Sequence, residues 1–159
     1  MRTNIQNINT DFTCKQCGRF VSANPVISGV VNRNHCPYCL YSRHLDLFEA
    51  GDRLCACKAL MAPVGITVKH SRDKYTHAVN GELMLAHRCK DCNTFSINRI
   101  AADDDPFRIL AVLCNADLIP DLKEISCQVG IHLLGKDSLS LVKTRLFGVV
   151  HEPLPAEIY

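Results

Sequence analysis

The sequence lacks the features that define several classes of protein. It contains no tryptophan, and 8 glycines and 7 prolines among 159 residues exclude collagen-like and low-complexity chains. With 47% hydrophobic and 21% charged residues, it also falls outside the disordered class. Its longest unbroken apolar run, Ile109 to Cys114, is far too short to span a membrane. Residues 1–12 carry no apolar stretch of the kind that a secretory signal needs. We therefore expect a cytoplasmic protein without membrane contacts.

Ten cysteines are the most informative feature that the chain does contain. The cytosol keeps thiols reduced, so clustered cysteines there indicate metal binding rather than disulfides. Six of the ten form three C-x-x-C pairs, at Cys14/Cys17, Cys36/Cys39 and Cys89/Cys92. Zinc takes four soft ligands at the corners of a tetrahedron, and a C-x-x-C turn holds two sulfurs at a suitable separation. The pairs therefore predict zinc as the cofactor.

The first two pairs predict one complete zinc site. Eighteen residues separate Cys17 from Cys36, which is enough for a hairpin that returns the second pair to the first. Gly18 follows the first pair directly and can adopt the positive φ of a tight turn. We expect one zinc ion to be held by Cys14, Cys17, Cys36 and Cys39.

The third pair predicts a second zinc site whose remaining ligands come from elsewhere in the chain. Cys57 is expected as the third ligand, because the 31 residues between it and Cys89 contain a hairpin signal that would close the loop. Ligand type leaves three candidates for the fourth position: Cys55, His87 and His44.

The front half of the chain carries strand signals. Val64, Ile66 and Val68 alternate as the residues of a half-buried strand do. Asn80-Gly81 indicates a two-residue hairpin turn, because both turn positions need positive φ. The other predicted strands lie at 19–22, 26–31, 75–79, 82–88 and around Phe95 and Ile97.

The periodicity becomes helical near Asp103. Asp105 can cap a helix that has Pro106 at its first position. Two more helices are predicted, one from Leu122, Ile125, Val129 and Leu133 and one after a cap at Asp137 or Ser138. Together these signals predict an α+β protein. Residues 12–104 would form a domain of two zinc-ribbon-like β-hairpin modules, and residues 105–159 a small helical segment that packs on it or self-associates.

The net charge differs between the two halves of the chain. Residues 1–100 contain 13 Lys and Arg against 7 Asp and Glu, a net +6, whereas residues 101–159 contain 5 against 9, a net −4. A zinc ion with four thiolates carries −2, and one with three thiolates and a neutral histidine carries −1. Two such sites leave the front half at roughly +2 to +3. This charge is compatible with contacts to nucleic acid but does not require them.

The segment Arg33-Asn34-His35-Cys36-Pro37 spells the motif of the RNHCP domain family of small bacterial proteins. The chain resembles this family over roughly residues 12–115, and the resemblance extends to 39–46, 51–53, 87–89 and 98–104. It implies zinc-ribbon-like metal binding and supplies no established activity. The family pattern has one cysteine where this chain has Cys55 and Cys57, and Cys57 matches it. The resemblance thus favours His87 or His44 over Cys55 as the fourth ligand.

Several polar residues in these motifs are neither apolar core nor zinc ligands. One interpretation is structural, because Arg–Asp pairs and Asn side chains can satisfy backbone groups that short zinc loops leave unpaired. A second is RNA recognition, because arginine makes bidentate phosphate contacts and Tyr38 and Tyr41 can stack on exposed bases. The candidate ligand-binding residues are Arg33, Asn34, His35, His44, Arg53, Asn98 and Arg99.

A third interpretation is catalysis. An additional metal or acid–base site could be built from His35, His44, Asp46, Asp103 and Asp104, but nothing in their spacing fixes a nucleophile or a general base. We therefore expect a zinc-binding module that contacts structured RNA or the ribosome and translation machinery. A metal-dependent hydrolase acting on a phosphate-containing substrate is the alternative.

Overall fold

The computed structural model describes residues 9–70 and 81–148. Within these ranges the chain is α+β, as the sequence predicts. The strands are β1 (Phe12–Thr13), β2 (Phe20–Val21), β3 (Ser42–Arg43), β4 (Leu60–Lys69), β5 (Glu82–Cys89) and β6 (Phe95–Arg99). The helices are α1 (Pro25–Ser28), α2 (Pro106–Ala116), α3 (Leu122–Gln128) and α4 (Leu139–Phe147), with a 3₁₀ turn η1 (Lys136–Ser138) before α4.

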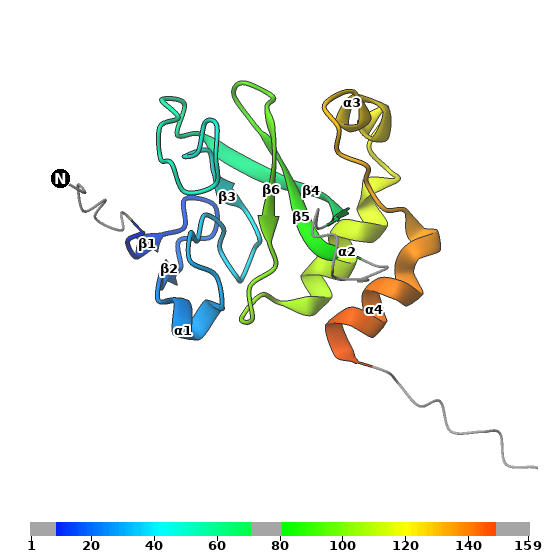
Figure 1. The fold of residues 1–159 in the computed structure, drawn as a ribbon, viewed down its shortest axis with the longest axis horizontal. Coiled ribbons are helices and arrows are strands. Elements are labelled where there is room, and N and C mark those ends of the chain that lie inside the picture. The colour runs from blue at the N-terminus through cyan, green and yellow to red at the C-terminus, as the bar shows by residue number, and fades with distance from the viewer. Residues whose placement is uncertain (1–8, 71–80, 149–159) are drawn as a thin grey trace, which may run out of the picture.

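The strands form two separate antiparallel sheets. β1 and β2 make a two-stranded sheet, and the others make a four-stranded sheet in the order β3-β4-β5-β6. β1, β2 and α1 lie at one end of the molecule and α3 and α4 at the other, with the four-stranded sheet between them (Figure 1). The alternating residues Val64 and Ile66 lie in β4, as predicted, and both are buried.

The main core joins this sheet to the helices. Ile66 and Leu85 face each other on β4 and β5 and pack with Ile109 and Leu113 of α2 and Val142 of α4. A much smaller cluster under β1 and β2 consists of Cys14, Val21 and Cys36, with Phe12 and Cys39 packed against it. The large core thus holds the sheet and helices together, whereas the N-terminal end has little apolar packing of its own.

The helix that the sequence places after Asp105 is present. The Asp105 carboxylate accepts hydrogen bonds from the backbone N–H groups of Phe107 and Arg108, and Pro106 occupies the first turn of α2. The predicted strand at 26–31 is wrong, because Pro25–Ser28 form the short helix α1. Asn24 caps α1 through its side chain and Pro25 opens it, so the same Asx-Pro signal begins both helices.

The helix predicted from Leu122 to Leu133 is shorter in the structure. α3 ends at Gln128, because Gly130 has a φ of 81° and Leu133 then forms an isolated β-bridge with Thr67 of β4. The predicted strand at 75–79 and its turn residue Asn80 lie outside the described residues. The strand predicted at 82–88 is present as β5, which pairs with β4 and β6.

No helix in the described ranges is long and apolar enough to cross a membrane.

Candidate metal centres

The first group of metal-ligating side chains is the one that the sequence predicts. The sulfur atoms of Cys14, Cys17, Cys36 and Cys39 lie within 4.8 Å of one another. The closest approaches are 3.5 Å between Cys14 and Cys39 and 3.6 Å between Cys17 and Cys36. Each C-x-x-C turn therefore contributes one sulfur to each close pair. We call these four residues the first metal group.

The second metal group consists of Cys57, Cys89, Cys92 and His44, whose ligand atoms also lie within 4.8 Å of one another. Cys57 Sγ is 3.7 Å from Cys89 Sγ, and Cys92 Sγ is 3.4 Å from His44 Nδ1. Backbone pairing explains why these four residues lie close together. The His44 carbonyl accepts from the Lys58 N–H at 3.1 Å, which places Cys57 beside His44. The register of β4 and β5 pairs Met61 with Cys89 and brings the third C-x-x-C turn to the same end of the sheet.

The three C-x-x-C turns share one backbone pattern. In each turn the first cysteine donates its N–H to the carbonyl five residues later, and the N–H four residues later donates back, at 2.8–3.2 Å. The residue that closes the turn has positive φ: 74° at Gly18, 63° at Leu40 and 60° at Asn93. Glycine and asparagine tolerate this conformation, whereas a leucine costs about 1–2 kcal/mol. Leu40 is fully buried in the main core, and this packing offsets the backbone strain.

Both groups match the dimensions of a tetrahedral zinc site. A Zn–S bond of about 2.3 Å places two sulfurs about 3.8 Å apart at the corners of a tetrahedron. The observed sulfur–sulfur contacts of 3.5–3.7 Å agree with this spacing. Four thiolates, or three thiolates and an imidazole, are the donor sets of structural zinc sites. The residues therefore fit zinc at both places.

Burial and hydrogen bonding shift the pKa values of the thiols in opposite directions. Burial raises the pKa of Cys36 to about 11 and also raises the pKa of Cys39. In the second group, hydrogen bonds with the side-chain hydroxyl and backbone of Thr94 lower the pKa of the exposed Cys92 to about 6. A bound cation stabilises the thiolate form of each ligand, so metal binding and deprotonation are coupled in both groups.

The other two candidates for the fourth ligand lie outside the second group. His87 is fully buried, and burial lowers its pKa to about 3, with the nearby His35 adding to the shift. Its Nε2 donates to the Leu40 carbonyl at 2.7 Å and its Nδ1 accepts from the Asn98 amide at 3.0 Å. Neither nitrogen retains a lone pair for a metal. Cys55 is buried and is absent from both groups, although it precedes Cys57 by only two residues.

The predicted recognition residues Arg33 and His35 form a buried ionic network. Arg33 is 1% exposed; its Nε donates to the His35 carbonyl at 3.1 Å and its Nη2 lies 2.8 Å from Asp103. His35 Nε2 lies 2.7 Å from the Asp104 carboxylate, which also accepts from the backbone N–H of Ala101 at 2.8 Å. The network ties the second C-x-x-C turn to the segment before α2, and it leaves Arg33 with no surface for a phosphate.

The remaining recognition candidates have varied partners. Asn34 is buried; its amide donates to Asp46 at 2.8 Å and its oxygen accepts from Arg53. Asn98 binds His87, and His44 belongs to the second metal group. Arg99 is the most accessible of the predicted set: its side chain is 61% exposed and forms an ion pair with Glu82 at 2.7 Å.

The accessible cations near the metal groups lie at positions that the sequence analysis did not single out. Four exposed lysines and arginines sit in the loops that carry metal ligands, at Lys15, Arg19, Lys58 and Lys90. Arg19 lies over the Tyr38 ring at 4.7 Å, and Lys90 lies over the Tyr41 ring at 5.8 Å. Their positions within two residues of a ligand cysteine were the available signal, because these loops expose the residues next to the ligands.

The two metal groups define a metal-binding protein, and comparison with known families narrows the class. The model of the RNHCP domain family matches residues 9–110, and the chain belongs to this family. The match begins before the first metal group and ends inside α2, so it includes both groups and the four-stranded sheet. No curated protein and no solved structure matches the chain.

Proposed function

We propose that the protein is a zinc-binding module that contacts structured RNA through the loops that hold its two metal ions. The observation that carries the proposal is the presence of two complete four-ligand groups whose loops present exposed cations. Each group supplies four ligands, as structural zinc sites do, whereas catalytic sites keep one position for water. This difference favours a binding role over the metal-dependent hydrolase.

The arrangement supports two zinc-ribbon-like modules within residues 12–104. The first would comprise the β1–β2 hairpin with the first two C-x-x-C turns, and the second would comprise β3 to β6 with the third turn. Residues 105–159 would then be a helical segment packed on the second module, in line with the contacts of α2 and α4 in the main core. In this organisation the metals fix the loops and the helices support the sheet.

The surface proposed for RNA follows the metal-bearing loops. Tyr38 lies inside the second C-x-x-C turn and Tyr41 follows it, so the aromatic rings of the Arg19–Tyr38 and Tyr41–Lys90 pairs come from the same short segment. Lys90 belongs to the third turn, and its contact with Tyr41 joins the loops of the two metal groups. Cations bind phosphates, and aromatic rings or guanidinium planes stack on unpaired bases. We call the surface formed by Lys15, Arg19, Tyr38, Tyr41, Lys58 and Lys90 the loop face.

Zinc binding is tested by metal analysis of the native protein followed by X-ray absorption. We expect two zinc ions per chain and seven sulfur neighbours to one nitrogen over the two ions, from the seven cysteines and one histidine of the groups. A stoichiometry of one, or an oxygen neighbour at either ion, would contradict the ligand sets.

RNA binding is tested by fluorescence anisotropy with a labelled RNA hairpin at several salt concentrations. Each lost phosphate contact reduces the salt slope by about 0.7 for a single-stranded segment, so Arg19→Ala combined with Lys90→Ala should reduce it by about 1.4. Lys143→Ala is the matched control, because it removes an exposed cation from α4, away from the metal loops. Equal affinity and slope for all variants, with two zinc ions retained, would refute the RNA contact.

A further inference from the structure

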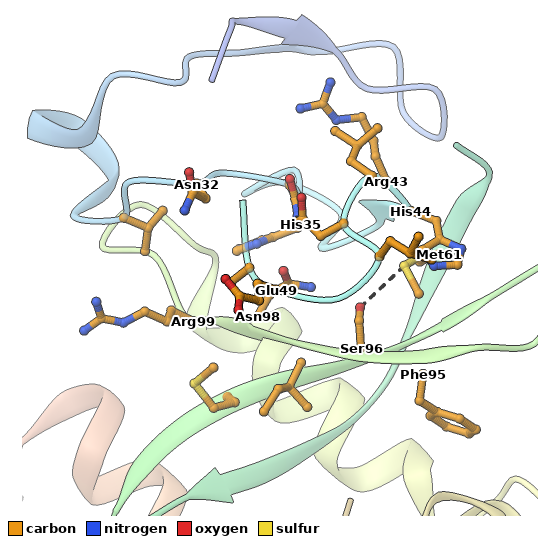
Figure 2. A pocket seen from close by; sticks show the side chains of 18 of the residues that line it. Asn32, His35, Arg43, His44, Glu49, Met61, Phe95, Ser96, Asn98 and Arg99 are labelled. Atoms are coloured by element: carbon orange, nitrogen blue, oxygen red, sulfur yellow. Dashed lines mark hydrogen bonds between the residues drawn. The ribbon is translucent and has the colours of Figure 1, made fainter. Parts of the chain in front are cut away.

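A pocket of about 550 Å³ lies between β6 and the segments 30–35 and 43–50, and it borders the second metal group at His44. Its size is in the range of small-molecule sites. The side chains of Ser96 and Asn98 point from β6 toward the opposite wall, where His35 and Glu49 lie, whereas Phe95 points away from them (Figure 2).

The wall opposite β6 is held in place by one carboxylate. Asp52 accepts hydrogen bonds from the backbone N–H groups of Leu47, Phe48 and Glu49 at 2.8–2.9 Å. These hydrogen bonds keep the pKa of Asp52 well below its usual range. These contacts order residues 47–49, and order that is present before binding lowers the entropic cost of binding.

Two polar side chains of β6 in this pocket can still bind a ligand. The His87 ring donates through Nε2, so its Nδ1 accepts and the Asn98 group facing it is the amide NH₂. This leaves the amide oxygen of Asn98 free to accept. The Ser96 hydroxyl has only a weak contact of 3.5 Å with the sulfur of Met61.

His35 lies on the opposite wall. Its side chain is 2% exposed, and its Nε2 lies 2.7 Å from the Asp104 carboxylate, a contact that fixes the ring in this wall.

Apolar side chains and cations complete the lining. Met61 and Met84 are buried in the pocket wall, and Phe48 is 82% exposed at its edge. Two exposed cations also line the pocket, Lys69 at the end of β4 and Arg99 at the end of β6. The pocket thus combines apolar surfaces, an inward acceptor at Asn98 and two exposed cations, while the carboxylates of Asp46 and Glu49 lie in the wall opposite β6.

We propose that this pocket binds a ribonucleotide whose base carries an exocyclic amino group, either as a free mononucleotide or as one unpaired nucleotide of an RNA. The base would lie against Met61 and Phe48 and donate its amino group to the Asn98 oxygen, and the phosphate would meet Arg99 or Lys69. The free-nucleotide form does not depend on the RNA proposal above, and the RNA form rests on it.

The test is calorimetric titration of the full-length, zinc-loaded protein with AMP, CMP, UMP and ribose 5-phosphate. AMP and CMP should bind more tightly than UMP, and ribose 5-phosphate more weakly than any of them. Ser96→Phe should lower the AMP affinity about tenfold or more, because the added ring fills the pocket. Ser140→Phe, the same change on an exposed face of α4, is the control. A zinc content of two per chain shows that the variants are folded, and Arg99→Ala tests the phosphate contact without filling the pocket.

The RNA hairpin assay separates the two sources of the nucleotide. If Ser96→Phe loses affinity for both RNA and AMP, the pocket binds a nucleotide of an RNA. If it loses affinity for AMP alone, the pocket binds a free mononucleotide. The proposal is overturned if AMP and CMP fail to bind at millimolar concentration, or if they bind no better than ribose 5-phosphate. It is also overturned if they bind Ser96→Phe as well as the native chain. None of these results touches the loop face, which the Arg19 and Lys90 variants test independently.

Discussion

The two metal groups differ in how the chain assembles them. The first uses two C-x-x-C turns within 26 residues and lies in a cluster with only Val21 and Phe12 as apolar neighbours from the strands. The second draws its ligands from positions 44 to 92, at one end of a sheet whose core continues into α2 and α4. Metal binding therefore replaces a hydrophobic core in the first region, whereas in the second it closes an end of a sheet that packing already supports.

The largest expected difference concerns the loss of one buried ligand from each group. Cys36→Ser should remove one zinc ion and abolish hydrogen-exchange protection in β1 and β2. Structural zinc supplies on the order of 10–16 kcal/mol in small domains, more than this small cluster can replace. Cys89→Ser should also remove one zinc ion but leave the centres of β4 and β5 protected. Loss of protection throughout the chain in Cys36→Ser would show that the two regions fold as one unit.

The histidines sharpen the comparison for the second group. His44→Ala should reduce the zinc content from two ions to one, and His44→Cys should restore the second, because a thiolate can replace the imidazole. His87→Ala should destabilise the protein by leaving the Leu40 carbonyl and the Asn98 amide without a partner, yet retain two zinc ions per folded chain. Zinc analysis of the three purified variants shows which histidine is the fourth ligand of the second metal group. Loss of zinc in His87→Ala with retention in His44→Ala would reverse the ligand assignment.

The sequence predicts the first group in full because its information is local. Two C-x-x-C turns and a glycine at the closing position specify geometry within a few residues. Local sequence does not identify the fourth ligand of the second group. His44, His87 and Cys55 are all suitable ligand types, and only the strand pairing decides which side chain reaches the sulfurs. His87 faces the interior of the sheet, where two hydrogen bonds occupy its ring.

The arginines show the same limit on what a sequence can predict. Arg33 adjoins a metal turn and has the chemistry of a phosphate ligand, but its partners Asp103 and Asp104 lie about 70 residues away. Spacing along the chain cannot reveal this pairing. The helix α1 is predictable in principle, because Asn24-Pro25 carries the same start signal as Asp105-Pro106, which predicts α2.

A smaller loss of stability is expected from breaking the ionic network that joins the second C-x-x-C turn to the segment before α2. Asp104 is fully buried between Arg33 and His35, so Asp104→Ala leaves a buried guanidinium with one carboxylate fewer. Removing one partner of a buried ion pair costs about 3–5 kcal/mol. Denaturant unfolding of the zinc-loaded protein measures this loss. Asp103→Ala is the comparison, because the Asp103 side chain is 30% exposed, and its cost should be clearly smaller. Equal losses would mean that Asp104 does not anchor the network.

The smallest loss of stability is expected from removing the N-cap of α2, next to this ionic network. Asp105 caps α2 through its carboxylate, while its backbone N–H donates to the Pro37 carbonyl of the second C-x-x-C turn at 3.1 Å. Asp105→Ala removes the cap and keeps the backbone contact, so it should cost about 1 kcal/mol without any change in zinc content. Asp105→Asn, which can still cap, should recover most of that loss. Unfolding curves and zinc analysis of the pair measure both quantities. Because α2 belongs to the large core and the turn belongs to the first metal group, a loss of zinc in Asp105→Ala would show that capping of α2 reaches the metal site. An unchanged zinc content would confine its effect to the region that packing holds together.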